Sequence, residues 1–262
     1  MNVDLGLFVS FFGIFFFYSL ILYFAAPRQT ITLKEIYISI LAGIASISVL
    51  QFTYAFLPNQ VTYNEFNEFM YVVAPREELS KFIMFLLVTT WISKKRKIKP
   101  VGYMIISCAV ALGFALEENM HYYLKYGEHV LSVRNVSAMP AHMFFGGIMG
   151  YWYAVGKLNI GKFGGRINLG QWFVKSRLAI YSTIGLFCAS LMHGIWNYSL
   201  SFYAKMINAI MDSIPKVMAL PVFNNGWLPI TLFALFILLF LMRILYRDLI
   251  RLEKEKQDYI KE

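Results

Sequence analysis

The stretch "PVGYMIISCAVALGFALEENMHYY", residues 100–123, decides the fold of this chain. It is an apolar run long enough to cross a membrane, yet it ends near two adjacent carboxylates, Glu117 and Glu118. An ionised carboxylate in hydrocarbon costs about 2.5 to 3.5 kcal/mol even on insertion scales. The run "APREELSKFIMFLL", residues 74–87, raises the same problem with Glu77 and Glu78. Acids placed at this cost indicate a polar site inside a membrane protein.

Composition supports a membrane protein. The chain has 262 residues, of which 58% are hydrophobic and 15% are charged. Several apolar runs exceed the roughly 18 residues that a spanning helix needs. The net charge of +9 comes from clusters of Lys and Arg between these runs, so it reflects membrane topology and predicts no nucleic-acid partner. Cys108 and Cys188 both lie inside apolar runs, and we predict a packing role for them.

The apolar runs predict an all-α fold, a polytopic membrane bundle of about seven transmembrane helices. We predict one integral membrane domain over residues 1–262, with a catalytic core in residues 70–200 and a charged cytoplasmic tail in residues 247–262. The predicted spans are residues 5–26, 35–57, 68–92, 101–124, 131–156, 177–203 and 227–246.

The loops between the spans set the predicted orientation. Lys and Arg gather in "SKKRKIKP" (residues 93–100), in residues 157–177 and in the tail, whereas "PNQVTYNEFNEF" (residues 58–69) has none. Cytoplasmic loops carry the excess of Lys and Arg. We therefore predict an external N-terminus, a cytoplasmic C-terminus and a multi-pass position in the cell membrane. Residues 204–226 then form an external loop to which the sequence assigns no role.

The polar residues of the predicted spans fall at one depth. Counted from the external ends at about 1.5 Å per residue, they lie roughly 9 to 17 Å below the surface. We expect these side chains to converge from four helices: Glu77 with Glu78, Glu118, His142 and His193. Residues three or four apart share a helix face, which adds three companions: Lys81, Phe114 and Asn197.

Other residues of these spans have structural interpretations. Pro75 should kink or restart the third span and so present the carboxylates near a helix N-terminus. Gly146 and Gly150 predict close helix packing. Lys81 also fits a structural ion pair with one of the preceding carboxylates. Three residues are expected near the external boundary: His121, His129 and Arg134. Arg134 either extends its charge to the interface or holds a carboxylate or a substrate backbone.

Four stretches stand out in order: "PREELSK" (75–81), "GFALEENMHYY" (113–123), "RNVSAMPAHMFFGGIMGYW" (134–152) and "LMHGIWN" (191–197). They resemble the motifs of the PrsW family of intramembrane proteases, which belongs with the type II CAAX prenyl proteases in a wider superfamily. The resemblance implies site-1 cleavage of a single-pass membrane protein, with a membrane-anchored anti-sigma factor as the best-known substrate type. The implied site residues are Glu77, Glu78, Lys81, Glu118, Asn119, His142, His193 and Asn197. The sequence departs from the family pattern at Glu117, where an apolar residue is expected.

Peptide hydrolysis in a membrane needs a base that activates water and donors that stabilise the oxyanion. We assign Glu77 or Glu78 as the base, assisted by His142. His193 and Asn197 are assigned as the oxyanion donors. This version of the site uses no metal.

Glu118 and Lys81 complete the assignment. Because two carboxylates in close contact do not both stay ionised, Glu118 would share a proton with the first acidic pair and pass it to the leaving amine. Lys81 would hold the remaining negative charge. Successive helical residues point about 100° apart, so Glu117 faces away from Glu118, and we predict that it is dispensable.

Three alternatives stay open. Within the enzyme class, zinc is the alternative to a metal-free site, with a candidate ligand set of Glu77, Glu118, His142 and His193. No compact H-E-x-x-H motif separates the two mechanisms, and we prefer the metal-free one on the wider resemblance. Intramembrane Glu and His also serve proton-coupled transporters, and a non-catalytic scaffold retaining the fold is the third reading. The expected partners are a single-pass substrate protein and the lipid bilayer, and the oligomeric state is left open.

Overall fold

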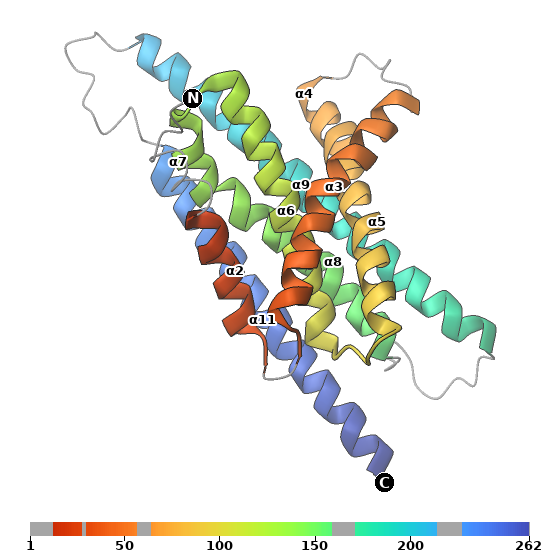
Figure 1. Ribbon diagram of the computed structural model, residues 1–262. Helices are drawn as coiled ribbons and strands as arrows, with labels where there is room; N and C mark the ends of the chain where they lie inside the picture. Colours follow the sequence, from red (N-terminus) through yellow and green to blue (C-terminus); the bar gives the residue numbers. More distant parts are fainter. Residues whose placement is uncertain (1–12, 28–29, 57–63, 159–170, 214–226, 262) are drawn as a thin grey trace.

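The computed structural model describes residues 13–27, 30–56, 64–158, 171–213 and 227–261 (Figure 1). Every regular element in these ranges is a helix, which confirms the all-α prediction. The elements are α2 (Ile14–Ala25), α3 (Leu33–Phe56), α4 (Glu65–Asn67), the π-helix η2 (Glu68–Val73), α5 (Ala74–Ser93), α6 (Pro100–Tyr126), α7 (His129–Val136), α8 (Ala138–Leu158), α9 (Gln171–Ser213) and α11 (Trp227–Lys261).

Three of these helices are long and apolar enough to cross a membrane by themselves. They are α3, α6 and the segment Arg177–Phe202 of α9. The described part of α2 is apolar but has only 12 residues. The chain is thus a helical membrane protein, and the number of spans and the orientation of the termini stay predictions.

The predicted span 131–156 is wrong as a single helix. α7 ends at Val136, α8 begins at Ala138, and Ser137 between them has a φ angle of −117°. Pro140 explains the break, because it has no N–H for the carbonyl of Val136 and its ring clashes with that carbonyl in a continuous helix. α8 can therefore leave α7 in a new direction, while the turn at Gly127, with a φ angle of 86°, brings α7 back over α6.

Pro75 acts as the sequence predicts. The span expected over residues 68–92 begins as η2, and the α-helical part restarts at Ala74, so that Pro75 lies in the first turn of α5. A proline is tolerated there because first-turn N–H groups have no partner inside the helix. This restart puts Glu77 and Glu78 within the first two turns of α5.

The predicted seventh span and the charged tail form one helix. α11 runs from Trp227 to Lys261 without a break. The tail is rich in Glu, Lys and Arg, which favour helices, and Arg251 contacts Asp248 at 2.5 Å and Glu255 at 3.7 Å. α9 also extends beyond its predicted end to Ser213, so the expected loop 204–226 begins as helix, and its remainder lies outside the described residues.

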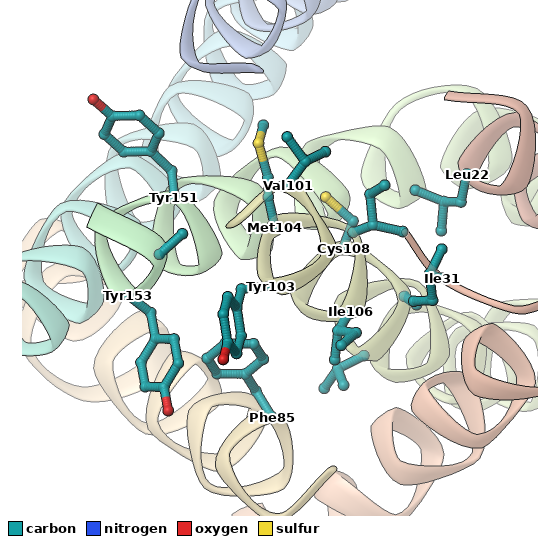
Figure 2. Packing of buried hydrophobic residues seen from close by; sticks show 14 of the residues in the cluster. Leu22, Ile31, Phe85, Val101, Tyr103, Met104, Ile106, Cys108, Tyr151 and Tyr153 are labelled. Atoms are coloured by element: carbon teal, nitrogen blue, oxygen red, sulfur yellow. The ribbon is translucent and has the colours of Figure 1, made fainter. Parts of the chain in front are cut away.

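α6 is the central helix of the bundle. In its apolar window 83% of residues are buried, against 33% in α3 and in α9. Figure 2 shows the α6 side chain of Tyr103 near Phe85 of α5 and Tyr153 of α8. The ring of Tyr153 lies edge-on to both, at centroid distances of 5.0 Å from Phe85 and 5.2 Å from Tyr103.

Glycines allow α8 to approach α6 closely, as the G-x-x-x-G pattern predicts. A Cβ atom on Gly146 would lie 2.7 Å from the carbonyl oxygen of Ser107, and one on Gly150 would lie 2.7 Å from Cα of Met104. Both distances are shorter than a carbon contact allows. The close packing therefore depends on the absence of side chains at these two positions.

The basic segments gather at one end of the bundle. Residues 94–99 and the C-terminal end of α11 lie at the same end, opposite α4 (Figure 1). We call this the basic end. There Arg96 binds both carboxylate oxygens of Glu35, at 2.9 and 2.6 Å, and donates to the carbonyl of Thr30 at 2.9 Å. These contacts tie the loop after α5 to the beginning of α3.

Candidate active site

The structure brings together all the residues that the sequence assigned to the site. Four long helices and the short α7 contribute to one polar group, which we call the active-site cluster. Its members are Glu77, Glu78 and Lys81 of α5, Glu118 and Asn119 of α6, Arg134 of α7, His142 of α8, and His193 and Asn197 of α9. A chain of hydrogen bonds and ion pairs connects most of them.

Lys81 lies at the centre of the cluster and is fully buried. Its ammonium is 2.5 Å from Glu78 and 3.2 Å from Nδ1 of His142, and it lies 4.4 Å above the ring centroid of Phe114. An ammonium only donates hydrogen bonds, so Nδ1 of His142 accepts. Nε2 of His142 then carries the proton and donates to Glu118 at 2.9 Å.

Glu78 orients the second histidine. Its Oε1 lies 2.8 Å from Nδ1 of His193, which donates the hydrogen bond because a carboxylate only accepts. Nε2 of His193 is then the unprotonated nitrogen and accepts from Asn197 at 3.1 Å. The ring of Phe145 stacks on His193 at a centroid distance of 4.9 Å. Sequence reasoning missed Phe145, although it lies three residues after His142 and so shares its helix face.

Glu77 is the carboxylate that the cluster does not satisfy. The residue is buried, and its Oε2 has no hydrogen-bond partner among the described residues. Nε2 of His193 is 3.7 Å from this oxygen, beyond hydrogen-bond range. A buried polar atom without a partner costs about 1 to 3 kcal/mol, and more when it is charged. Oε2 of Glu78 is also without a partner among the described residues, but Oε1 of Glu78 is held by Lys81 and His193, so Glu77 is the less constrained of the two acids.

Glu77, His142 and His193 fit a metal ion. One ligand atom from each lies within 4.8 Å of the others, and all three residues are buried. A Glu/His/His set suits zinc. Each histidine also has a carboxylate on its other ring nitrogen, from Glu78 or Glu118, which is how proteins orient histidine ligands. The nitrogen of His142 that remains is the one that contacts Lys81, so a metal ion there would replace that contact.

Glu118 is not a member of this three-residue group, in contrast to the zinc set expected from the sequence. Its Oε2 is already held by His142 and by Arg134, which is 2.7 Å away. Arg134 also donates to Asn119 at 2.7 Å, and Asn119 donates to Asn135 at 3.1 Å. Of the roles considered for Arg134, the structure supports the holding of a carboxylate.

Tyr122 and Asn135 are neighbours of the site that the sequence did not reveal. The guanidinium of Arg134 lies 3.7 Å above the ring centroid of Tyr122, which is four residues beyond Glu118. Asn135 is adjacent to Arg134 in sequence, and its carbonyl accepts from Tyr18 of α2 at 2.9 Å. The first contact joins α7 to α6, and the second joins α7 to α2.

Helix geometry separates Glu117 from Glu118, as predicted. Oε1 of Glu117 is 3.8 Å from His121, and the two side chains are 34% and 56% exposed. Phe114, on the same face as Glu118, is fully buried against Lys81 and His142. Glu117 therefore lies outside the cluster, and the side chain of His129 lies outside the described residues.

An apolar helical bundle that holds two buried carboxylates, a half-buried one and two buried histidines against one another defines a membrane protein with a polar centre suited to hydrolysis. The chain matches the family model described as PrsW family intramembrane metalloprotease over residues 7–226, and it belongs to this family. No curated protein and no solved structure matches it. Membership confirms the family resemblance of the four motifs and indicates a membrane-embedded peptidase. The family description names a metalloprotease, so our preference for metal-free hydrolysis finds no support.

Proposed function

We propose that this protein is an intramembrane endopeptidase with a zinc site made by Glu77, His142 and His193. The observation that carries the proposal is the buried grouping of these three ligands within 4.8 Å, in a member of a family described as metalloproteases. Zinc in such a site makes a bound water acidic enough to act as a nucleophile near neutral pH and polarises the peptide carbonyl.

The protein's own residues have separate roles in this proposal. Glu78 and Glu118 orient the rings of His193 and His142 through the hydrogen bonds described above. Asn197 is a half-buried amide donor beside His193, and it is available to the carbonyl oxygen of the substrate as negative charge develops there.

Glu118 is our choice for the group that takes a proton from the attacking water and passes it to the leaving amine. Its side chain is 20% exposed, whereas those of Glu77 and Glu78 are 10% and 0% exposed. A proton donor to the leaving amine has to reach the substrate. Arg134 holds the carboxylate in place while this happens.

A metal-free reaction is the second candidate, and the position of Lys81 favours it. An ammonium 3.2 Å from Nδ1 of His142 occupies one of the nitrogens that a metal would use. In this version Glu77 is the general base. Oε2 is unpartnered among the described residues in both Glu77 and Glu78, but Oε1 of Glu78 is held by Lys81 and His193. Asn197 would then stabilise the oxyanion, and His193 would join it only when a proton is added to its Nε2, because its Nδ1–H is held by Glu78.

We propose a single-pass membrane protein as substrate, of the anti-sigma-factor type, cut near the external side of the bilayer. The depth of the cluster supports this choice. At about 1.5 Å per residue, Glu118 lies roughly 12 Å along α6 from Tyr126 and roughly 27 Å from Pro100, which is at the basic end. The predicted orientation puts the basic end in the cytoplasm.

The test is cleavage of a single-pass reporter by the purified protein in liposomes, with and without a chelator, together with metal analysis. The zinc proposal expects stoichiometric zinc, loss of cleavage with the chelator and recovery on return of zinc. Full activity of a zinc-free preparation would replace it with the metal-free mechanism. Sequencing the new N-terminus of the product locates the cut, and a cut in the cytoplasmic half would contradict the proposed depth.

A further inference from the structure

An apolar groove lies on the opposite side of α8 from the active-site cluster. It has a volume of about 760 Å³ and is lined by α2, α6, α8 and α11, together with Val136 at the end of α7. α2 and α11 lie beside each other in Figure 1. Met143 and Phe144 of α8 line it, whereas His142 of the same helix points into the cluster. The volume is within the roughly 300 to 1,000 Å³ of ligand sites.

The wall of the groove has almost no polar groups. Apart from the Cys108 thiol, its polar side chains among the lining residues are Tyr18, Arg243 and Tyr246. The hydroxyl of Tyr18 donates to the carbonyl of Asn135, and that of Tyr246 donates to the carbonyl of Ala25 at 3.0 Å. Among the described lining residues, Arg243 is therefore the one charged side chain, and it lies one turn before Tyr246 on α11, on the side away from the basic end.

A second arginine continues the charge along α11. Arg243, Arg247 and Arg251 are spaced four residues apart and so share a helix face. Arg251 is neutralised by Asp248 and Glu255. In the part of the chain that the structure describes, no carboxylate pairs with Arg243 or Arg247. An apolar groove thus ends at two uncompensated positive charges.

We propose that this groove binds one anionic phospholipid, with its acyl chains between α2 and α11 and its phosphate on Arg243 and Arg247. Guanidinium groups bind phosphate oxygens in a forked geometry, and arginines at a membrane surface attract anionic lipids. Acyl chains would cover the exposed apolar side chains at the groove, of which Phe17, Phe236 and Leu239 are 58%, 67% and 61% exposed. The site is separate from the peptidase function and would tie α2 to the bundle.

The test is the retention of lipid by the purified full chain after incubation with vesicles of equal parts phosphatidylglycerol and phosphatidylcholine, read by native mass spectrometry. We expect one phosphatidylglycerol per chain, retained in preference to phosphatidylcholine. The double variant R243Q/R247Q should lose this preference by about tenfold or more, and R251Q should keep it because Arg251 is already paired. Equal retention of both lipids, or equal loss in R251Q, would overturn the proposal.

A groove-filling variant tests where the acyl chains lie. Leu239→Trp places a bulky ring in the groove, and Leu41→Trp makes the same change at a residue of α3 that is 63% exposed and does not line it. We expect Leu239→Trp to lose phosphatidylglycerol and Leu41→Trp to keep it. If Leu239→Trp keeps the lipid but stops reporter cleavage, the groove docks the substrate helix and the proposal is wrong. If it keeps the lipid but changes the oligomeric mass, a second copy occupies the groove, which also refutes it.

Discussion

Replacing Glu118 with Gln tests whether the active-site cluster takes part in catalysis or only stabilises the fold. The substitution keeps the size of the side chain and leaves an oxygen that can accept from His142. It removes the negative charge that faces Arg134 at 2.7 Å. The adjacent Glu117→Gln makes the same chemical change on another face of α6, where the partner is His121 at 3.8 Å. The two variants are therefore matched controls for each other.

The contacts give different magnitudes for the two variants. A carboxylate that orients a histidine in a metal site contributes about 10- to 100-fold to activity, and a group that transfers a proton contributes about 10²- to 10⁴-fold. We therefore expect Glu118→Gln to lose at least about a hundredfold in cleavage rate. Leaving Arg134 without its charge partner costs about 1 to 3 kcal/mol of stability. The exposed contact of Glu117 contributes about 0.3 to 0.5 kcal/mol to stability. The cleavage rate of Glu117→Gln should therefore change by about twofold or less.

The assay is the cleavage rate of the single-pass reporter per molecule of properly folded enzyme, with the yield of detergent-extracted protein measured in parallel. We expect both variants to be inserted and recovered in comparable amounts, and only Glu118→Gln to be inactive. Equal loss of cleavage at normal yield would mean that the wrong face of α6 was assigned to the site. Equal activity would mean that the Glu118 carboxylate only stabilises the fold.

Two further changes test the packing around the site, and a third tests a contact remote from it. Lys81→Met should leave Glu78 buried without its cation and lower the melting temperature by several degrees together with cleavage, whereas an unchanged melting temperature would contradict a buried ion pair. Gly146→Leu should separate α8 from α6 at a cost of about 1 to 3 kcal/mol or more, and a normal yield of active enzyme would refute the close approach. Arg96→Gln, remote from the site, should cost about 1 kcal/mol or less with unchanged cleavage per folded molecule, and a selective loss of cleavage would show that the contact acts on the site.

Much of the site can be predicted from residue spacing and position along the sequence. Helix periodicity puts Phe114 with Glu118 and Asn197 with His193, and the common depth brings the four long helices together. In the structure Asn197 donates to His193, and Phe114 and Glu118 both contact His142. Depth is a reliable guide here because a membrane fixes the direction of its helices, so position along the sequence converts directly into height.

The partner of Lys81 could not be chosen from the sequence. Glu77 and Glu78 lie four and three residues before it, and both spacings permit a contact on a helix. In the structure the partner of Lys81 is Glu78. His193 of α9 approaches the same carboxylate, so the Lys81 ammonium and Nδ1–H of His193 both donate to Oε1 of Glu78. This choice is tertiary, since it depends on how α9 packs against α5.

The apolar pattern also did not predict α7 as a separate helix, although the proline that causes the break is present in the sequence. Pro140 interrupts the predicted span, but hydropathy averages over such a residue. Once the helix breaks at Ser137, α7 brings Arg134 to Glu118 and Asn119. The missing N–H of Pro140 is enough to predict the break, but it does not predict which carboxylate Arg134 contacts.

The charges of the active-site cluster explain why Glu77 decides the mechanism. Its three carboxylates and two cations, Lys81 and Arg134, leave one negative charge if both histidines are neutral. Glu78 and Glu118 each contact a cation directly, at 2.5 and 2.7 Å. The excess charge therefore belongs to Glu77, whose Oε2 has no hydrogen-bond partner among the described residues. An uncompensated charge at a buried site is costly, so Glu77 needs either a proton or a cation. A metal ion bound by Glu77 would make the site that of a metalloprotease. In the metal-free reaction Glu77 would instead take a proton from the attacking water. Both mechanisms therefore use the Glu77 carboxylate.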